Sequence, residues 1–329
     1  MNQFIESTGV EFPIIGGPMY PCSNPELVAA ISEAGALGII QPLSLTYVHG
    51  YDFLQGLKYI QSLTAKPLGF NALIEKSSRR YQQRMSSWID IALDQGVLFF
   101  ITSLGKPDWV VERVHAYGGQ VYHDVTERKW AEIGVDCGVD GLICVNNRAG
   151  GHAGKLSALQ LYEACFSLNK PLVCAGGISD SDGLQDMLKI GYQACQLGTR
   201  FIASDECRVS DTYKQAIIAA GEKDITLTEK MTGVPVSIIK PASKNEQQFK
   251  AQGVLSWMLS SKKFKHVTRL FLSLRSIMNL KAVISSDNDN SEYWQAGKSV
   301  AGIHSVLSVK QIIQQLMKKQ EIKVHSEDS

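Results

Sequence analysis

The sequence predicts an α/β protein: a (β/α)8 TIM barrel with a smaller, mainly helical lid subdomain inserted after the eighth strand. Short apolar runs recur eight times before about residue 203, and their starts lie 22 to 31 residues apart. That interval accommodates one strand, one helix and two short loops, and parallel strands require such a crossover. The runs also show little polar alternation, which is typical of strands buried on both faces. A doubly wound open sheet is the alternative.

The predicted strands fill residues 1–203, which we assign to the barrel. They begin at residues 13, 37, 68, 97, 119, 141, 171 and 194, and they read PIIGGPM, LGIIQP, LGFNAL, VLFFITSLG, GQVYHDV, GLICVN, PLVCAGGI and ACQLGTRF. The segments between them have helix signals. NPELVAAISEAG offers Asn24 as an N-cap and Gly35 as a stop, and SDSDGLQDMLKIG offers Asp180 or Ser181 and then Gly191.

The regular spacing ends after the eighth strand. Residues 204–290 are predicted to form a helical lid or substrate subdomain. Residues 291–329 are predicted to return over the active site and to end in a helix, VLSVKQIIQQLMKKQ, that packs on the barrel. Between Phe249 and Ser286 there are seven bases and no acid. This pattern is typical of a solvated lid face, and a docking surface for an acidic partner is the alternative.

Composition excludes several classes of function. The 329 residues include 33 Lys or Arg and 32 Asp or Glu, and 44% are apolar. Such a balance gives no general attraction to nucleic acid or to an anionic membrane. With no signal peptide and no long apolar span, we expect a cytoplasmic protein. The seven cysteines form no Cys-x-x-Cys pair, so we expect reduced thiols and no metal site.

Glycine-rich segments follow the last three predicted strands, where the active site of such a barrel lies. They are RAGGHAG, AGGIS and GTRF. Backbone N–H groups in the loops after strands 7 and 8 commonly bind a phosphate. We therefore predict a phosphate site, with tight turning alone as the alternative. Its residues are Ala175, Gly176, Gly177, Gly198 and Thr199.

Other nucleotide and hydrolase motifs are absent. The chain has no G-x-G-x-x-G dinucleotide fingerprint and no G-x-S-x-G nucleophile elbow. AGGHAGKL resembles a P-loop only in part, because Ala149 replaces its first glycine and Leu156 follows Lys155. ATP binding is therefore not predicted.

Seven segments together resemble a known family: GGPMY, ISEAGALGII, GFNALI, AGGHAGKL, CAGGIS, LGTRF and YWQAGKSVAGIH. The chain resembles the FMN-dependent nitronate monooxygenases, formerly called 2-nitropropane dioxygenases. Flavin-dependent enoyl-ACP reductases share most of these motifs. The resemblance covers nearly the whole chain, least clearly residues 204–285. It implies a TIM barrel that holds FMN noncovalently.

The resemblance also implies roles for residues at the strand ends. Asn71 is expected to hydrogen-bond the polar edge of the flavin ring. The phosphate residues agree with the prediction made above from the glycine loops. The residues expected beside the ring are Gly17, Pro18 and Met19, and those expected on the strand-6 side are Gly150 and Gly151.

His152 is the candidate catalytic residue. It follows a barrel strand and lies among glycines that leave space around it, and the family places its catalytic histidine in the same AGGH motif. Imidazole titrates near neutral pH, so it can stabilise an anionic nitronate or remove the α-proton of a nitroalkane. A purely structural histidine is the alternative.

Five further residues are noted without a firm role. Relatives often have Glu before AGGH, where this chain has Arg148; an inward cation would favour a small anionic substrate, and a solvent-facing one is the alternative. Tyr293 and Trp294 resemble the segment that returns over the active site, so they contact substrate or only pack. His123 and Asp124 end the fifth predicted strand and face the mouth if the register is right.

The leading hypothesis is FMN-dependent oxidation of small alkyl nitronates, such as propionate 3-nitronate, by O2 to a carbonyl product and nitrite. The first alternative is an NAD(P)H-dependent enoyl-ACP reductase, whose basic helix would dock acyl carrier protein. The second is a flavin-binding module without turnover. The sequence leaves the oligomeric state open, a homodimer included.

Overall fold

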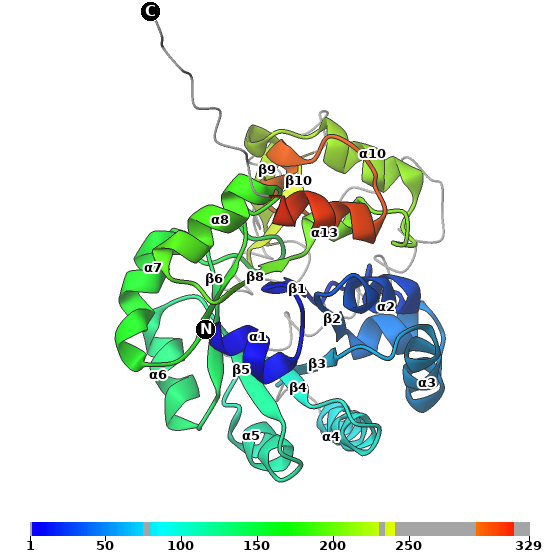
Figure 1. The fold of residues 1–329 in the computed structure, drawn as a ribbon, viewed down its shortest axis with the longest axis vertical. Coiled ribbons are helices and arrows are strands. Elements are labelled where there is room, and N and C mark those ends of the chain that lie inside the picture. Colours follow the sequence, from blue (N-terminus) through cyan, green and yellow to red (C-terminus); the bar gives the residue numbers. More distant parts are fainter. Residues whose placement is uncertain (1, 75–78, 230–233, 241–293, 319–329) are drawn as a thin grey trace, which may run out of the picture.

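The protein folds into the predicted closed barrel of eight parallel strands (Figure 1). The computed structural model describes residues 2–74, 79–229, 234–240 and 294–318. Each strand pairs with the next in the sequence, and β8 closes the ring by pairing with β1. The open-sheet alternative is therefore wrong. The strands are β1 (Ile14–Gly16), β2 (Leu37–Ile40), β3 (Leu68–Leu73), β4 (Phe99–Ser103), β5 (Gln120–Val125), β6 (Gly141–Val145), β7 (Leu172–Ala175) and β8 (Ala194–Leu197).

Helices form the outer layer, as the strand spacing predicts. A π-helical turn, η1 (Ser44–Val48), precedes α3, and a 3₁₀ turn, η2 (Phe166–Leu168), follows α7. The helices that follow β1 to β7 are α2 (Pro25–Glu33), α3 (Phe53–Leu63), α4 (Arg79–Asp94), α5 (Asp108–His115), α6 (Arg128–Asp136), α7 (Ala158–Cys165) and α8 (Ser181–Ile190). The predicted last helix, α13 (Val309–Met317), contacts α8 and α2 and fills the eighth position in the ring (Figure 1).

Local sequence signals explain where α8 begins and ends. Asp180 is the N-cap of α8, and its side chain accepts a hydrogen bond from the first turn of the helix, as predicted. Gly191 ends the same helix. Asn24 occupies the N-cap position of α2, but its side chain donates instead to Glu26 and to the Glu206 carbonyl oxygen. Asn24 thus ties α2 to the chain that follows β8.

The core has two layers, because alternate residues of each strand face the barrel interior and the helices. The interior contains Ile15, Ile39 and Ile143 among other apolar side chains. A short helix, α1 (Gln3–Thr8), crosses the N-terminal end of the barrel (Figure 1). Its buried Phe4 packs edge-on against two interior rings. Apolar side chains around Phe4 thus fill the barrel interior at its N-terminal end.

The chain after β8 contains strands that the sequence analysis did not predict. Its described elements are α9 (Thr199–Ile202), α10 (Asp211–Ala219), η3 (Glu222–Asp224), β9 (Ile225–Thr228), β10 (Val236–Ile239) and η5 (Lys298–Gly302). The strands β9 and β10 form an antiparallel pair. Residues 241–293, which include the basic stretch and Tyr293, lie outside the described residues, so the predicted subdomain division stays a prediction. Among the described helices, none has both the length and the apolarity needed to cross a bilayer.

Candidate active site at the C-terminal end of the barrel

The loop after β1 lies against the loop after β8. A Cβ atom built on Gly198 would lie 3.3 Å from the Met19 sulfur atom, and one on Gly17 would lie 2.9 Å from Cγ of Gln196. Hydrogen bonds hold this loop: the Met19 N–H donates to Ser23 Oγ at 2.9 Å. The β1 loop, whose Gly17, Pro18 and Met19 are predicted to lie beside a ring, is thus adjacent to Gly198, one of the residues predicted to bind a phosphate.

The loops after β6 and β7 are joined through Asn146. Its Nδ2 atom donates to the Gly176 carbonyl oxygen at 2.9 Å, and its Oδ1 atom accepts from the Arg148 N–H at 2.8 Å. Gly176 has φ +115°, and a Cβ atom there would lie 2.6 Å from the Ala149 nitrogen. Part of the glycine requirement in AGGIS is therefore close contact between two loops.

The loops after β7 and β8 present backbone N–H groups that the described part of the chain leaves without an acceptor. Among the described residues, no hydrogen bond involves the N–H groups of Gly176, Gly177 or Gly198. Ala175 ends β7 directly before them, and Thr199 accepts a hydrogen bond from the Gly297 N–H at 3.0 Å. Free N–H groups from neighbouring loops form a suitable cradle for an anion. The arrangement fits the predicted phosphate site.

Three polar side chains face the barrel interior in its C-terminal half. The Asn71 amide of β3 donates to the Ile101 carbonyl oxygen at 3.4 Å, a long hydrogen bond. Asp124 Oδ1 and Gln196 Oε1 are buried atoms with no hydrogen-bond partner among the described residues. Buried polar atoms normally have a partner, so these two fit contact with a bound polar group such as a flavin ring. Gln196 is not among the residues predicted from the sequence, although a polar residue at an interior position of an apolar strand is a usable signal.

The loop that carries His152 crosses the ends of β5 and β6. A Cβ atom on Gly154 would lie 2.4 Å from the Val145 carbonyl oxygen and 3.4 Å from Thr126 Cβ. On its other side the loop pairs with β10, since the Ser237 N–H donates to the Gly151 carbonyl oxygen at 2.8 Å. The His152 side chain is exposed at this rim. Its imidazole is therefore accessible to a small molecule.

Gly150 of the AGGH loop lies in close contact with the return segment, at Gly297. A Cβ atom on Gly150 would lie 3.1 Å from the Gly297 nitrogen and 3.6 Å from Thr199 Oγ1. The structure thus brings the AGGH loop, the loop after β8 and the QAGK segment together. Among the predicted site residues that the structure describes, only Asn71 lies on β3, away from the loops that follow β1, β6, β7 and β8.

His123 and Asp124 face opposite ways, so the expectation that both face the mouth is wrong for His123. Asp124 is in the interior phase of β5. The His123 Nδ1 atom lies 2.9 Å from Thr102 Oγ1 on the helix side of the barrel, and its ring contacts Gly134 of α6. Burial lowers the pKa of His123 to about 4, so its imidazole is neutral at physiological pH.

Arg148 points neither into the barrel nor freely to solvent. Its guanidinium forms a two-pronged ion pair with Glu222, with both N–O distances 2.9 Å, and Lys298 Nζ lies 3.5 Å from the same carboxylate. Arg148 thus ties the AGGH loop to the chain after the barrel.

Trp294 stacks on Tyr213, with ring centroids 5.8 Å apart, and its Nε1 atom is buried without a partner among the described residues.

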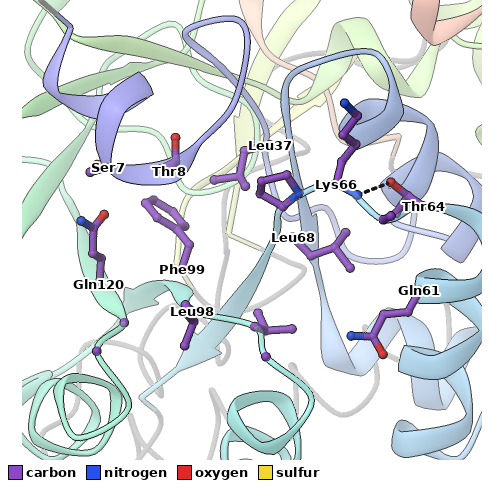
Figure 2. Close-up of a pocket in the computed structure, with 16 residues that line it drawn as sticks. Ser7, Thr8, Leu37, Gln61, Thr64, Lys66, Leu68, Leu98, Phe99 and Gln120 are labelled. Carbon is purple, nitrogen blue, oxygen red and sulfur yellow. Dashed lines mark hydrogen bonds between the residues drawn. The ribbon is translucent and has the colours of Figure 1, made fainter.

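A cavity of about 530 Å³ lies at the opposite end of the barrel (Figure 2). It is lined by the N-terminal ends of β3, β4 and β5 and by α1. Its lining residues include Leu68, Phe99 and Gln120. None of the predicted site residues lines this cavity. Residues at this end of such barrels serve stability rather than catalysis. The candidate active site is therefore the C-terminal cluster.

Comparison with known proteins places the chain in a family. The nitronate monooxygenase family matches residues 2–319. A probable nitronate monooxygenase of Staphylococcus saprophyticus is 29% identical over 282 residues, which cover 73% of this chain and 77% of that protein. The (3aS,4S,5R,7aS)-5-hydroxy-7a-methyl-1-oxo-octahydro-1H-indene-4-carboxyl-CoA dehydrogenase of Rhodococcus jostii is 25% identical, with 94% and 92% covered. The structure of FabK from Thermotoga maritima has a TM-score of 0.77 and 25% identity, with 96% and 94% covered. Because the family match spans nearly the whole chain, the protein belongs to the nitronate monooxygenase family.

Proposed function

We propose that this protein binds FMN at the C-terminal mouth of the barrel and oxidises small alkyl nitronates, such as propionate 3-nitronate, with O2. The products are a carbonyl compound and nitrite. Family membership supports the reaction type, and the unused N–H groups and buried polar atoms support a bound flavin phosphate and ring. The observation that carries the proposal is the position of His152, whose loop crosses the ends of β5 and β6.

The residues at the mouth have separable tasks in this proposal. The N–H groups of the loops after β7 and β8, with the Thr199 hydroxyl, hold the phosphate. Asn71 contacts the polar edge of the ring, and the β1 and β6 loops line the ring. The lining residues are Gly17, Pro18, Met19, Gly150 and Gly151. Bound FMN supplies the electron acceptor that the oxidation requires.

His152 acts on the substrate. A protonated imidazole donates a hydrogen bond to the nitronate anion, whereas a neutral one accepts the α-proton of the parent nitroalkane. Histidine side chains can perform either task near neutral pH. Arg148 does not provide the anion site, since its guanidinium is bound to Glu222.

One specific observation favours a second candidate, an NAD(P)H-dependent enoyl-ACP reductase. FabK of Thermotoga maritima and a carboxyl-CoA dehydrogenase of Rhodococcus jostii both align with more than nine-tenths of this chain. Under this alternative, FMN held by the same residues would supply hydride transfer from NAD(P)H to the carbon–carbon double bond of an enoyl thioester, which also takes up one proton. Acyl carrier protein would dock on the basic stretch that lies outside the described residues.

Anaerobic mixing of the yellow protein with NADH or with propionate 3-nitronate tests the proposal. We expect the nitronate, and not NADH, to reduce the flavin, and we expect nitrite in the presence of O2. Bleaching by NADH alone would favour the reductase, and no reaction with either would favour a binding module.

A His152→Ala variant tests the assigned role. We expect it to stay yellow and to lose at least about 100-fold in turnover, the usual contribution of a positioned acid or base. His304→Ala is the matched control, because His304 is exposed on another part of the chain. Unchanged turnover in His152→Ala would remove His152 from the mechanism.

A further inference from the structure

Asp124 is a carboxyl group that the proposed mechanism does not use. It occupies the interior phase of β5 in the C-terminal half of the barrel, level with Ile143 of β6. Its Oδ1 atom is buried and has no hydrogen-bond partner among the described residues. A carboxylate in that setting lacks the donors that normally stabilise its charge.

Asp124 lies beneath the loop that carries His152. Thr126 follows Asp124 by two residues, and the Gly154 backbone of the AGGH loop lies against Thr126 and against the Val145 carbonyl oxygen. The C-terminal end of β5, which carries Asp124, is therefore next to the AGGH loop.

Within the described ranges, no charged neighbour accounts for the raised pKa of Asp124. The interior residue level with it on β6 is Ile143, and the interior residue of β4 that follows Ile101 is Ser103; neither side chain titrates in the accessible range. The titratable groups nearby are Tyr122, one interior position below, His123, which faces the helices, and His152 in the loop above. Burial alone raises the pKa of Asp124 to about 7. Near neutral pH a large share of the molecules therefore carries a neutral carboxylic acid here.

We propose that Asp124 carries a proton in the loaded protein and donates it as a hydrogen bond to the ring of the flavin. The inference rests on the proposed function, since it presupposes a flavin in the mouth. A neutral acid supplies one donor in a site where Gln196 and the strand carbonyls offer acceptors. Its ionisation at higher pH puts a negative charge beside the ring, which disfavours electron uptake by the flavin.

The test is to measure the visible spectrum and the reduction potential of the purified holoprotein as a function of pH, from about pH 5 to about pH 9. This range brackets the raised pKa of the Asp124 carboxyl group. We expect a spectral transition, with the potential falling more steeply above it. Asp124→Asn keeps an amide donor of the same shape but cannot ionise, so the transition should be absent. Asp124→Ser, a smaller donor, serves if the asparagine variant folds poorly, with the same expected absence.

A matched control separates Asp124 from the catalytic histidine. His152→Gln should retain the transition, because it leaves Asp124 in place. A transition that persists in both Asp124 variants, or one that disappears only in His152→Gln, would overturn the inference. A yellow wild-type protein with a pH-independent spectrum would overturn it while leaving the proposed function intact. A wild-type protein that stays colourless with FMN would overturn both.

Discussion

Gly176 combines a backbone conformation that other residues rarely adopt with a contact that leaves no space for a side chain. Its φ is +115°, and an added Cβ atom would meet the Ala149 nitrogen at 2.6 Å. We expect Gly176→Ala to lower the free energy of unfolding by more than about 2 kcal/mol, through backbone strain and steric overlap together.

Gly118→Ala is the control for that substitution. Gly118 also has a positive φ, +72°, but an added Cβ atom there would meet nothing within 4 Å. Strain alone should then cost about 1–2 kcal/mol. Urea unfolding of both variants measures the difference, and equal losses would show that contact between the loops after β6 and β7 contributes nothing.

His123 predicts a pH dependence of stability. Its folded pKa of about 4 lies below the unfolded value of 6.5, so the unfolded state binds a proton first as the pH falls. His123 therefore costs stability as the pH drops from 6.5 toward 4. Asp124 acts with the opposite sign over an overlapping range, because its folded pKa is raised. The difference between wild type and a variant isolates the histidine.

We expect the stability of wild type relative to His123→Gln to fall by roughly 2–3 kcal/mol between about pH 7 and about pH 4. Denaturant unfolding at a series of pH values measures this difference. His304→Gln, at an exposed position, should show no such slope. A pH-independent difference for His123→Gln would mean that His123 is protonated inside the fold.

At the element scale, α13 belongs to the barrel although more than a hundred residues separate it from β8 in the sequence. Ile312 of α13 is 1% exposed and packs in the layer between helices and strands. We expect Ile312→Ala to cost about 2–5 kcal/mol, the usual range for a buried aliphatic side chain. Lys310→Ala, on the exposed face of the same helix, should change stability by less than about 0.5 kcal/mol.

Thermal unfolding followed by circular dichroism checks the role of α13. If α13 is the eighth helix of the barrel, Ile312→Ala should lower the midpoint of the main transition. An early transition of small amplitude, with the main one unmoved, would instead mean that α13 unfolds independently of the barrel.

The elements differ in how well the sequence predicts them. The eight barrel strands are predictable because each is a continuous apolar run buried on both faces and separated from the next by a helix signal. The antiparallel pair of β9 and β10 is not predictable in this way. Its strands, ITLT and VSII, have only four residues each and interrupt a region whose sequence pattern is mainly helical. Short strands get their stability from partners distant in sequence, which local pattern does not specify.

The candidate site divides in the same way. Glycine loops and His152 are predictable, since their order along the strands places them at one end of any such barrel. Which of His123 and Asp124 faces inward depends on the phase of one strand, and a shift by one residue reverses the answer. The ion pair between Arg148 and Glu222 joins residues 74 apart, so only the folded chain reveals it.

At the scale of the whole molecule, the two ends of the barrel have different tasks. The N-terminal end is closed by Phe4, which is fully buried and packs against Phe99 and Tyr122. The C-terminal end has N–H groups and buried polar atoms that find no hydrogen-bond partner in the part of the chain that the structure describes. Stability and chemistry should therefore be separable by mutation.

Phe4→Ala tests that separation. We expect a loss of about 3–5 kcal/mol in the free energy of unfolding, since a large buried ring leaves a cavity at the base of the barrel. At a temperature well below its midpoint, the variant should retain bound flavin and wild-type turnover with nitronate, because the site lies at the other end. His152→Ala should show the reverse, with near wild-type stability and lost turnover. If the Phe4→Ala protein is fully folded but has low turnover with nitronate, packing at the base of the barrel controls the geometry of the mouth.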